Sequence, residues 1–233
     1  MSRLIAAVIR HADYQQLANT PSAWQPFPLT RLGMQQAMDA AISMRSLLQQ
    51  NEWQLIEDID TSSLLRAWQT AHIYMIQLQK LFPSPAQLQS YDALAERSVG
   101  SAANLDLQQI EKIVAQDPRF DSLPTNWKSD SRFKLPLPGA ESLLEAGERV
   151  AAHMRQQMSK LPRKASVQVK LFVGHGAAFR HAAYHLGVIG FDQIAELSMH
   201  HGRPIYLEYL PDGRWQHIAG DWKRRVRNDD YAD

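Results

Sequence analysis

Two histidines, two arginines and a glutamate have the residue types and positions of a catalytic set. They are Arg10, His11, Arg66, Glu96 and His175, and each stands at or shortly after the end of a short, mostly apolar run. Arginine binds the oxygens of an anion bidentately, and a neutral imidazole is a nucleophile. A carboxyl group protonates a leaving oxygen. Together these side chains could bind a phosphate group and transfer it through a histidine.

The apolar pattern predicts the elements that would hold these side chains. Short apolar runs predict strands at 3–9, 53–59, 88–94 and 167–173. Apolar residues at helical spacing predict helices at 33–50, 64–78, 107–114, 142–154 and 177–186. Ser142 and Glu145 have the spacing of a capping box. Two further runs, 205–210 and 215–219, flank Pro211-Asp212-Gly213 and predict a hairpin.

Strands that alternate with helices indicate an α/β fold. We expect a three-layer α/β/α sandwich with a mainly parallel central sheet and a C-terminal hairpin. Ligands bind at the carboxyl ends of strands in such sheets, so four strand ends would bring the five side chains to one edge. We expect residues 1–233 to form a single domain. Within it, a loop excursion at about 117–139 is either a surface loop or a cap over the site.

Composition excludes several classes of function. The chain has 233 residues with 25 Lys and Arg against 24 Asp and Glu, a net charge of +1, which argues against nucleic-acid binding and against a polybasic membrane protein. Cysteine is absent, which excludes disulfides, cysteine-ligated zinc and thiol nucleophiles. The apolar stretch between Arg3 and Arg10 is too short for a signal peptide. We therefore expect a cytoplasmic protein.

Several motifs, taken in order, resemble those of the histidine phosphatase superfamily in its phosphoglycerate-mutase-like branch. They are Arg10-His11-Ala12, Leu29 to Ala37, Ser62 to Ala71, Leu94-Ala95-Glu96, Gly139 to Ser142 and Gly174-His175-Gly176. The resemblance implies that His11 is the phosphohistidine nucleophile and that Glu96 is the proton donor and later the base. It also implies a phosphate pocket made of Arg10, Arg66 and a catalytic His175. It implies no metal and no organic cofactor.

The chain departs from the family pattern in ways that bear on the reaction. Ala12 replaces the usual glycine after the histidine. Val99 stands near a position where the mutases typically carry a tyrosine, and Ala177 and Ala178 follow Gly176 where they usually place a small polar residue. These departures favour a phosphatase over a mutase. Together with the resemblance, which implies a phosphohistidine intermediate and no metal, they lead us to expect a metal-independent phosphomonoesterase that acts on a small phosphorylated substrate. Phosphoglycerate-mutase-type phosphoryl transfer and a non-catalytic phosphate-sensing module are the alternatives.

Other polar residues have simpler interpretations. Thr30 is expected to cap a helix and, like Gly176, could also contact substrate. Three other glutamates, Glu57, Glu141 and Glu145, compete with Glu96 for the acid role. His181 and His185 have a spacing that could bind zinc, but without a third ligand at a fitting spacing they indicate an ordinary helix. His200 and His201 are expected in a solvated turn or at the pocket rim.

Overall fold

The computed structural model describes residues 2–225. Its main sheet has the strand order β4-β3-β5-β1-β7-β8, and β2 pairs with β5. The strands are β1 (Arg3–Arg10), β2 (Gln54–Leu55), β3 (Asp58–Ser62), β4 (Gln87–Tyr91), β5 (Val167–Gly174), β7 (Pro204–Tyr209) and β8 (Trp215–Ala219). The pairings among β1 to β5 are parallel, whereas β7 is antiparallel to both β1 and β8. The C-terminal hairpin is confirmed.

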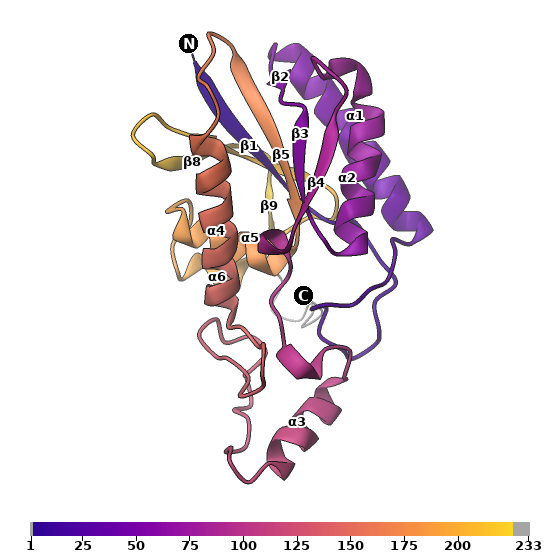
Figure 1. Ribbon diagram of the computed structural model, residues 1–233, viewed down its shortest axis with the longest axis vertical. Coiled ribbons are helices and arrows are strands. Elements are labelled where there is room, and N and C mark those ends of the chain that lie inside the picture. The colour runs from indigo at the N-terminus through magenta and orange to yellow at the C-terminus, as the bar shows by residue number, and fades with distance from the viewer. Residues whose placement is uncertain (1, 226–233) are drawn as a thin grey trace.

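Helices cover both faces of the sheet, as Figure 1 shows. They are α1 (Arg31–Gln50), α2 (Leu65–Gln77), α3 (Leu107–Gln116), α4 (Leu143–Ser159), α5 (Gly176–His185) and the short α6 (Gln193–Glu196). Short 3-10 turns lie at Gln79–Leu81, Asp92–Leu94 and Gly100–Ala102. β6 (Leu197–Met199) and β9 (Trp222–Arg224) form a second, two-stranded sheet that the sequence pattern did not predict. The expected α/β sandwich is confirmed.

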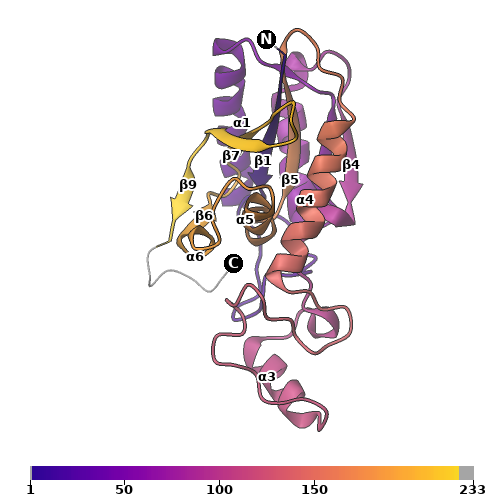
Figure 2. The same ribbon diagram turned by 90° about the vertical axis from the view of Figure 1, so that its left-hand side faces the viewer.

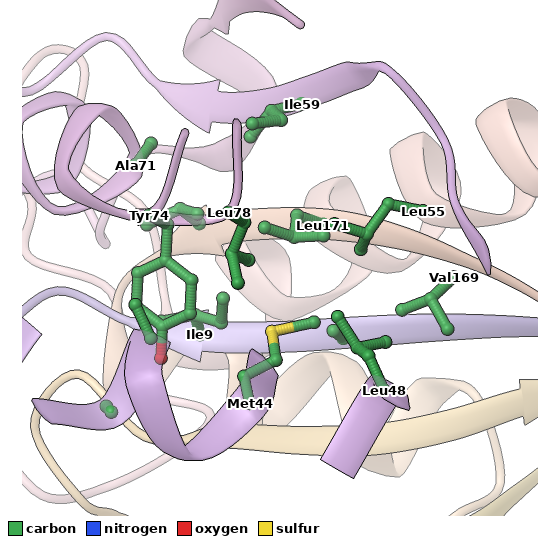
Figure 3. Close-up of a cluster of buried hydrophobic side chains, with 14 of the residues drawn as sticks. Ile9, Met44, Leu48, Leu55, Ile59, Ala71, Tyr74, Leu78, Val169 and Leu171 are labelled. Carbon is green, nitrogen blue, oxygen red and sulfur yellow. The ribbon is translucent and has the colours of Figure 1, made fainter. Parts of the chain in front are cut away.

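Strand β1 contributes to two hydrophobic cores. Its odd-numbered residues, such as Ile5 and Ile9, pack with α1 and α2, and its even-numbered residues, such as Leu4 and Val8, pack with α4 and α5. Burial on both faces explains why the strand is a continuous apolar run. Figure 3 shows the first core, where Met44 lies close to Ile9 and Leu48. These cores fix the strand ends that carry the site.

The strand expected at 53–59 is wrong in its extent. The chain forms two short strands there, because β2 pairs with β5 at Gln168 and Val169 whereas β3 pairs with β5 further along, at Phe172 and Val173. Apolar residues stand on both sides of the break, Leu55 and Ile56 before Glu57 and Ile59 after it, so the pattern does not reveal the break. We had expected the strand to end at residue 59, with Asp60 to Ser62 after it. In the structure these residues belong to β3.

A second layer of structure extends beyond the carboxyl edge of the sheet. Both views show α3 and its flanking loops there (Figures 1 and 2). Residues 117–142 are turns and loops, and their Trp127 packs in a small apolar cluster with Ala23, Val99 and Ile110. No helix among residues 2–225 combines the length and the apolar character needed to cross a membrane.

Candidate active site

The ends of β1 and β5 bring two histidines side by side. The strands are parallel neighbours, and their register places Arg10 opposite Gly174. The next backbone hydrogen bond joins the His11 amide to the Gly174 carbonyl at 2.8 Å. His11 and His175 therefore leave the sheet at the same level, and their ring centroids lie 5.1 Å apart.

The imidazole of His11 is 2% exposed and is held in a single tautomer. Its Nδ1 lies 2.8 Å from the Ala12 carbonyl oxygen, and because a carbonyl only accepts, Nδ1 carries the hydrogen and Nε2 keeps its lone pair. Burial, and after it the charges of Arg66, His175 and Arg10, lower the pKa of His11 well below its ordinary value. The ring is therefore neutral at neutral pH, as a nucleophile must be.

Arg66 lies in the first turn of α2 and is fully buried. Its Nη1 donates to the Gln25 carbonyl at 2.8 Å, and its Nη2 donates to the carbonyls of Ser22 and Ala23 at 2.7 and 2.8 Å. Its buried Nε has no hydrogen-bond partner among residues 2–225. The guanidinium thus fixes the loop between β1 and α1, while its Nε donor is not engaged with the protein among the described residues.

His175 connects Arg66 to the end of β3. The Arg66 Nη2 lies 3.2 Å from His175 Nδ1, so Nδ1 accepts and Nε2 carries the hydrogen. That Nε2 donates to the Ser62 hydroxyl at 2.9 Å. Burial, followed by the charges of Arg66, Arg10 and Arg149, lowers the His175 pKa well below its ordinary value. A contact with a phosphoryl oxygen through this ring would require one of these two bonds to be exchanged.

Arg10 reaches across the edge of the sheet toward α5. Its Nη1 donates to the Met199 carbonyl at 3.1 Å. A Cβ atom on Gly176 would stand only 2.9 Å from Arg10 Cδ, so the glycine leaves room for the arginine side chain. The His201 ring is stacked on His11 with a centroid separation of 6.0 Å. His201 therefore lies beside His11.

Glu96 approaches the same place from the loop that follows β4. Its side chain is buried, and its Oε1 accepts from the Arg97 amide at 2.9 Å and from the Ala178 amide in the first turn of α5 at 3.1 Å. Both donors fix the carboxyl group beside α5. A cavity of about 10 Å³ lies here, lined by Pro21, Ser22, Ala23, Glu96, Arg97, Leu143 and Ala177.

The chain matches a known family over most of its length. A sequence model of the histidine phosphatase superfamily (branch 1) matches residues 7–219. The chain belongs to this superfamily. One relative is the 2,3-bisphosphoglycerate-dependent phosphoglycerate mutase of Parvibaculum lavamentivorans, which is 26% identical over 206 residues, covering 88% of this chain and 90% of that protein.

Solved structures of other proteins share the histidine phosphatase fold seen here. A mycobacterial glucosyl-3-phosphoglycerate phosphatase matches with a TM-score of 0.68 and 18% identity, covering 93% of this chain and 96% of that one. A phosphoglycerate mutase from Bacillus anthracis matches with a TM-score of 0.69 and 16% identity, covering 94% and 93%. Phosphatases and mutases therefore both occur among the proteins with this fold.

Other residues considered from the sequence have structural partners in this member of the histidine phosphatase superfamily. Thr30 caps α1 and donates its hydroxyl hydrogen to Asp13 at 2.6 Å. Glu141 forms an ion pair with Arg149 at 2.7 Å, and Glu145 completes the capping box of α4. Glu57 lines a cavity near the start of β3, away from the carboxyl edge of the sheet. Only Glu96 of the four glutamates lines the cavity beside Ala177.

The ring nitrogens of His181 and His185 all contact other groups of the protein. His181 Nδ1 donates to the Ala177 carbonyl at 2.7 Å, and its Nε2 lies 2.9 Å from the Ser131 hydroxyl. His185 Nε2 donates to the Leu144 carbonyl, and its Nδ1 lies 2.8 Å from Glu148. These contacts agree with an ordinary helix.

Sequence reasoning missed two side chains at the site. Ser62 holds His175, and its place in the Ser62-Ser63-x-x-Arg66 motif was the available signal. Tyr14 lies against both His11 and Arg66 and stands only three residues after His11. The carbonyls that hold Arg66 had no signal, because every residue has a carbonyl.

Proposed function

We propose that this histidine phosphatase is a phosphomonoesterase that works through a phosphohistidine on His11. The observation that carries the proposal is the state of the His11 ring. It is buried and neutral, its Nδ1 hydrogen is bound to the Ala12 carbonyl so that Nε2 keeps its lone pair, and Arg66, His175 and Arg10 lie near enough for their charges to lower its pKa. A nucleophile in a cationic pocket is suited to attack a phosphate ester.

The reaction has two balanced steps. In the first, the Nε2 lone pair of His11 forms a bond to phosphorus, and the ester P–O bond breaks. The leaving oxygen keeps the bonding electrons and takes a proton from the Glu96 carboxyl group. In the second, water attacks phosphorus and gives a proton to the Glu96 carboxylate. The P–N bond breaks, its electrons return to Nε2, and inorganic phosphate leaves.

Charged side chains would stabilise the transferred group. Arg10 and the Nε of Arg66 supply donors for phosphoryl oxygens, and His175 positions Arg66 through its Nδ1. Donors fixed in a site from which water is excluded stabilise developing charge well because they need no reorganisation. We infer that these groups neutralise the charge of the phosphate, so that the proposed reaction needs no metal ion.

Hydrolysis is favoured over mutase-type transfer by the residues around Glu96. Val99 is buried in an apolar cluster and Ala177 lines the small cavity, so neither offers a polar side chain to a second substrate group. The mutase alternative is motivated by the relative from Parvibaculum. A mutase would return the phosphoryl group to a sugar-acid product and release little phosphate. A phosphate-sensing module would turn over no substrate.

We propose further that residues 117–139 serve as a cap that supports the loop over the site. Arg97, next to Glu96, donates to the Lys128 carbonyl at 3.4 Å, and Ser131 contacts His181 of α5. Trp127 packs in the same apolar cluster as Ala23, whose carbonyl binds Arg66. The excursion is thereby linked to both sides of the pocket.

The test is a panel of phosphomonoesters with released phosphate as the readout. Hydrolysis that a chelator does not slow and that vanadate inhibits supports the proposal, and rapid quenching should trap an acid-labile, base-stable phosphoprotein. Transfer to a sugar-acid acceptor with little phosphate release would establish the mutase. A strict metal requirement would contradict the assignment, and no turnover of any ester would favour a sensing module.

A further inference from the structure

Tyr14 is held firmly in the loop that follows β1. Its backbone forms an isolated antiparallel bridge with Leu29, close to the start of α1. Its ring packs in a small apolar cluster with Ala12, Leu29 and Ala37. The position of the ring is therefore set by the same loop that carries His11 and by the helix that follows it.

The ring of Tyr14 touches two groups of the proposed phosphate pocket. It meets the His11 ring edge to face, with centroids 5.2 Å apart and an interplanar angle of 89°. The guanidinium carbon of Arg66 lies 4.5 Å from the centroid of the Tyr14 ring, which is within the range of a cation–π contact. One side chain thus contacts both the nucleophile and the arginine.

The hydroxyl of Tyr14 has no structural use that accounts for its burial. The residue is 7% exposed, and its oxygen has no hydrogen-bond partner among residues 2–225. Ser22 lies near enough to lower the phenol pKa slightly, but the two side chains do not meet hydrogen-bond geometry. Buried polar groups are normally satisfied, so an unpartnered hydroxyl beside a nucleophile points to a ligand.

The surroundings keep this hydroxyl protonated. Burial raises the pKa of Tyr14 to about 12, and the charges of Arg66, Glu96 and Arg10 lie near enough to shift it as well. All three residues belong to the proposed site. At neutral pH the phenol is thus a hydrogen-bond donor placed among the groups that would surround a phosphate.

We propose that Tyr14 is a catalytic residue whose hydroxyl donates a hydrogen bond to a phosphoryl oxygen while the group moves to and from His11. This inference rests on the proposed function, because it assigns a ligand to the same site. The donor is fixed before substrate arrives, which makes it more effective at developing charge than a mobile one. It adds a neutral donor beside the two arginines of the pocket.

The experiment compares Tyr14→Phe with Tyr206→Phe, which removes another buried phenol hydroxyl at a site packed against Trp53. Hydrogen bonds to charged groups predict that Tyr14→Phe forms phospho-His11 about 10- to 100-fold more slowly in single-turnover assays. Alkyl and nitrophenyl phosphates should be slowed alike, because the phosphoryl oxygens are common to both. Vanadate should bind more weakly by a similar factor. Tyr206→Phe should match the wild type in rate and in vanadate affinity.

The melting temperature provides an independent readout. Because the hydroxyl has no protein partner, Tyr14→Phe should melt no lower than the wild type. Wild-type rates and vanadate affinity in Tyr14→Phe would overturn the inference, and so would a variant that is unfolded or melts well below the wild type, since the hydroxyl would then serve the fold.

Failure of the proposed function is distinguishable from failure of this inference. If the wild type hydrolyses no ester, the phosphatase assignment fails. The binding of inorganic phosphate and vanadate then tests whether Tyr14 is a ligand of the anion. Weaker binding of both anions by Tyr14→Phe alone would then support Tyr14 as their ligand. Equal binding by the variant and the wild type, or no binding by the wild type, would overturn it.

Discussion

The two halves of the candidate site are held by different means. In the first half, the sheet edge, consecutive hydrogen bonds between β1 and β5 fix Arg10, His11 and His175. In the second half, the loop side, Arg66 and Glu96 are positioned by contacts between side chains and loop or helix backbone groups. Sheet ladders open cooperatively and at higher cost than isolated loop contacts. His11, the proposed nucleophile, therefore rests on a rigid frame, whereas Arg66 and Glu96, which are proposed to bind and protonate the substrate, depend on loops.

The largest effect is expected from the sheet edge. His11→Ala removes the only nucleophile in the proposed mechanism while leaving the backbone bond to Gly174 intact. Phosphate release should fall by more than about 10⁴-fold, as for other enzymes that lose their nucleophile, and no phosphoprotein should be trapped. His217→Ala, at an exposed site, is the matched control. Retained turnover in His11→Ala would contradict the mechanism.

The sheet edge was also the half that the sequence predicted well. The strands at 3–9 and 167–173 are buried on both faces, so their apolar runs were visible, and the residues that follow them came together as expected. The end of β3 was missed because it is polar although buried. There Asp60 lies 2.7 Å from Lys170 and 2.9 Å from His153, and such internal pairing leaves no apolar pattern.

The loop side was predicted only as a set of residue types. The motifs identified Arg66 and Glu96, but not what holds them. Arg66 is held by three backbone carbonyls and Glu96 accepts from two backbone amides, groups that every sequence contains. The contacts of Arg66 depend on the path of the proline-rich loop between β1 and α1, which supplies the three carbonyls. Local periodicity contains no information on that path.

The second-largest effect is expected from Glu96→Gln. An alkoxide is a poor leaving group and needs a proton, so formation of phospho-His11 from alkyl phosphates should slow by about 10²- to 10⁴-fold. Nitrophenyl phosphate, whose leaving group needs no proton, should be slowed far less. Single-turnover kinetics with both substrates is the measurement, because hydrolysis of the phosphohistidine can limit steady-state rates.

A control variant sharpens the result for Glu96. Glu141→Gln breaks an ion pair with Arg149 and should affect stability more than the ratio between the two substrates. Equal slowing of alkyl and nitrophenyl phosphates in Glu96→Gln would mean that another group donates the proton. Asp13, which follows Ala12 in the same loop, would then be tested as Asp13→Asn.

Arg66→Lys should show how far the loop side depends on this one side chain. Lysine cannot bond to three carbonyls and to His175 at once, so the loop over the site should loosen. Loss of a fixed donor predicts about a 10²- to 10³-fold fall in kcat/KM, together with faster proteolysis within residues 16–28. Arg31→Lys, at an exposed position, is the control. Lost activity with unchanged proteolysis would mean that Arg66 serves phosphate binding and not loop order.

The smallest effect is expected in how stability depends on pH, and it compares the halves without substrate. Burial lowers the pKa of His11 well below its ordinary value, and that of His181 to about 3, with Arg180, Arg97 and His185 also near His181. An unfolded histidine titrates near pH 6.5, so below that pH the unfolded chain binds protons that the folded chain does not. The free energy of unfolding should fall with decreasing pH by up to about 1.4 kcal/mol per unit for each such histidine.

His11 belongs to the sheet edge, and His181 holds the loop side through Ser131. The free energy of unfolding of His11→Ala and His181→Gln should be measured with urea between about pH 7 and pH 5. In each variant its dependence on pH should be shallower than in the wild type by the contribution of the one histidine that was removed. Equal reductions would show that both halves stay closed until the whole chain unfolds. A smaller reduction for His181→Gln would show that the loop side opens and protonates His181 before the whole chain unfolds. An unchanged slope in both variants would contradict the burial of the two rings as neutral groups.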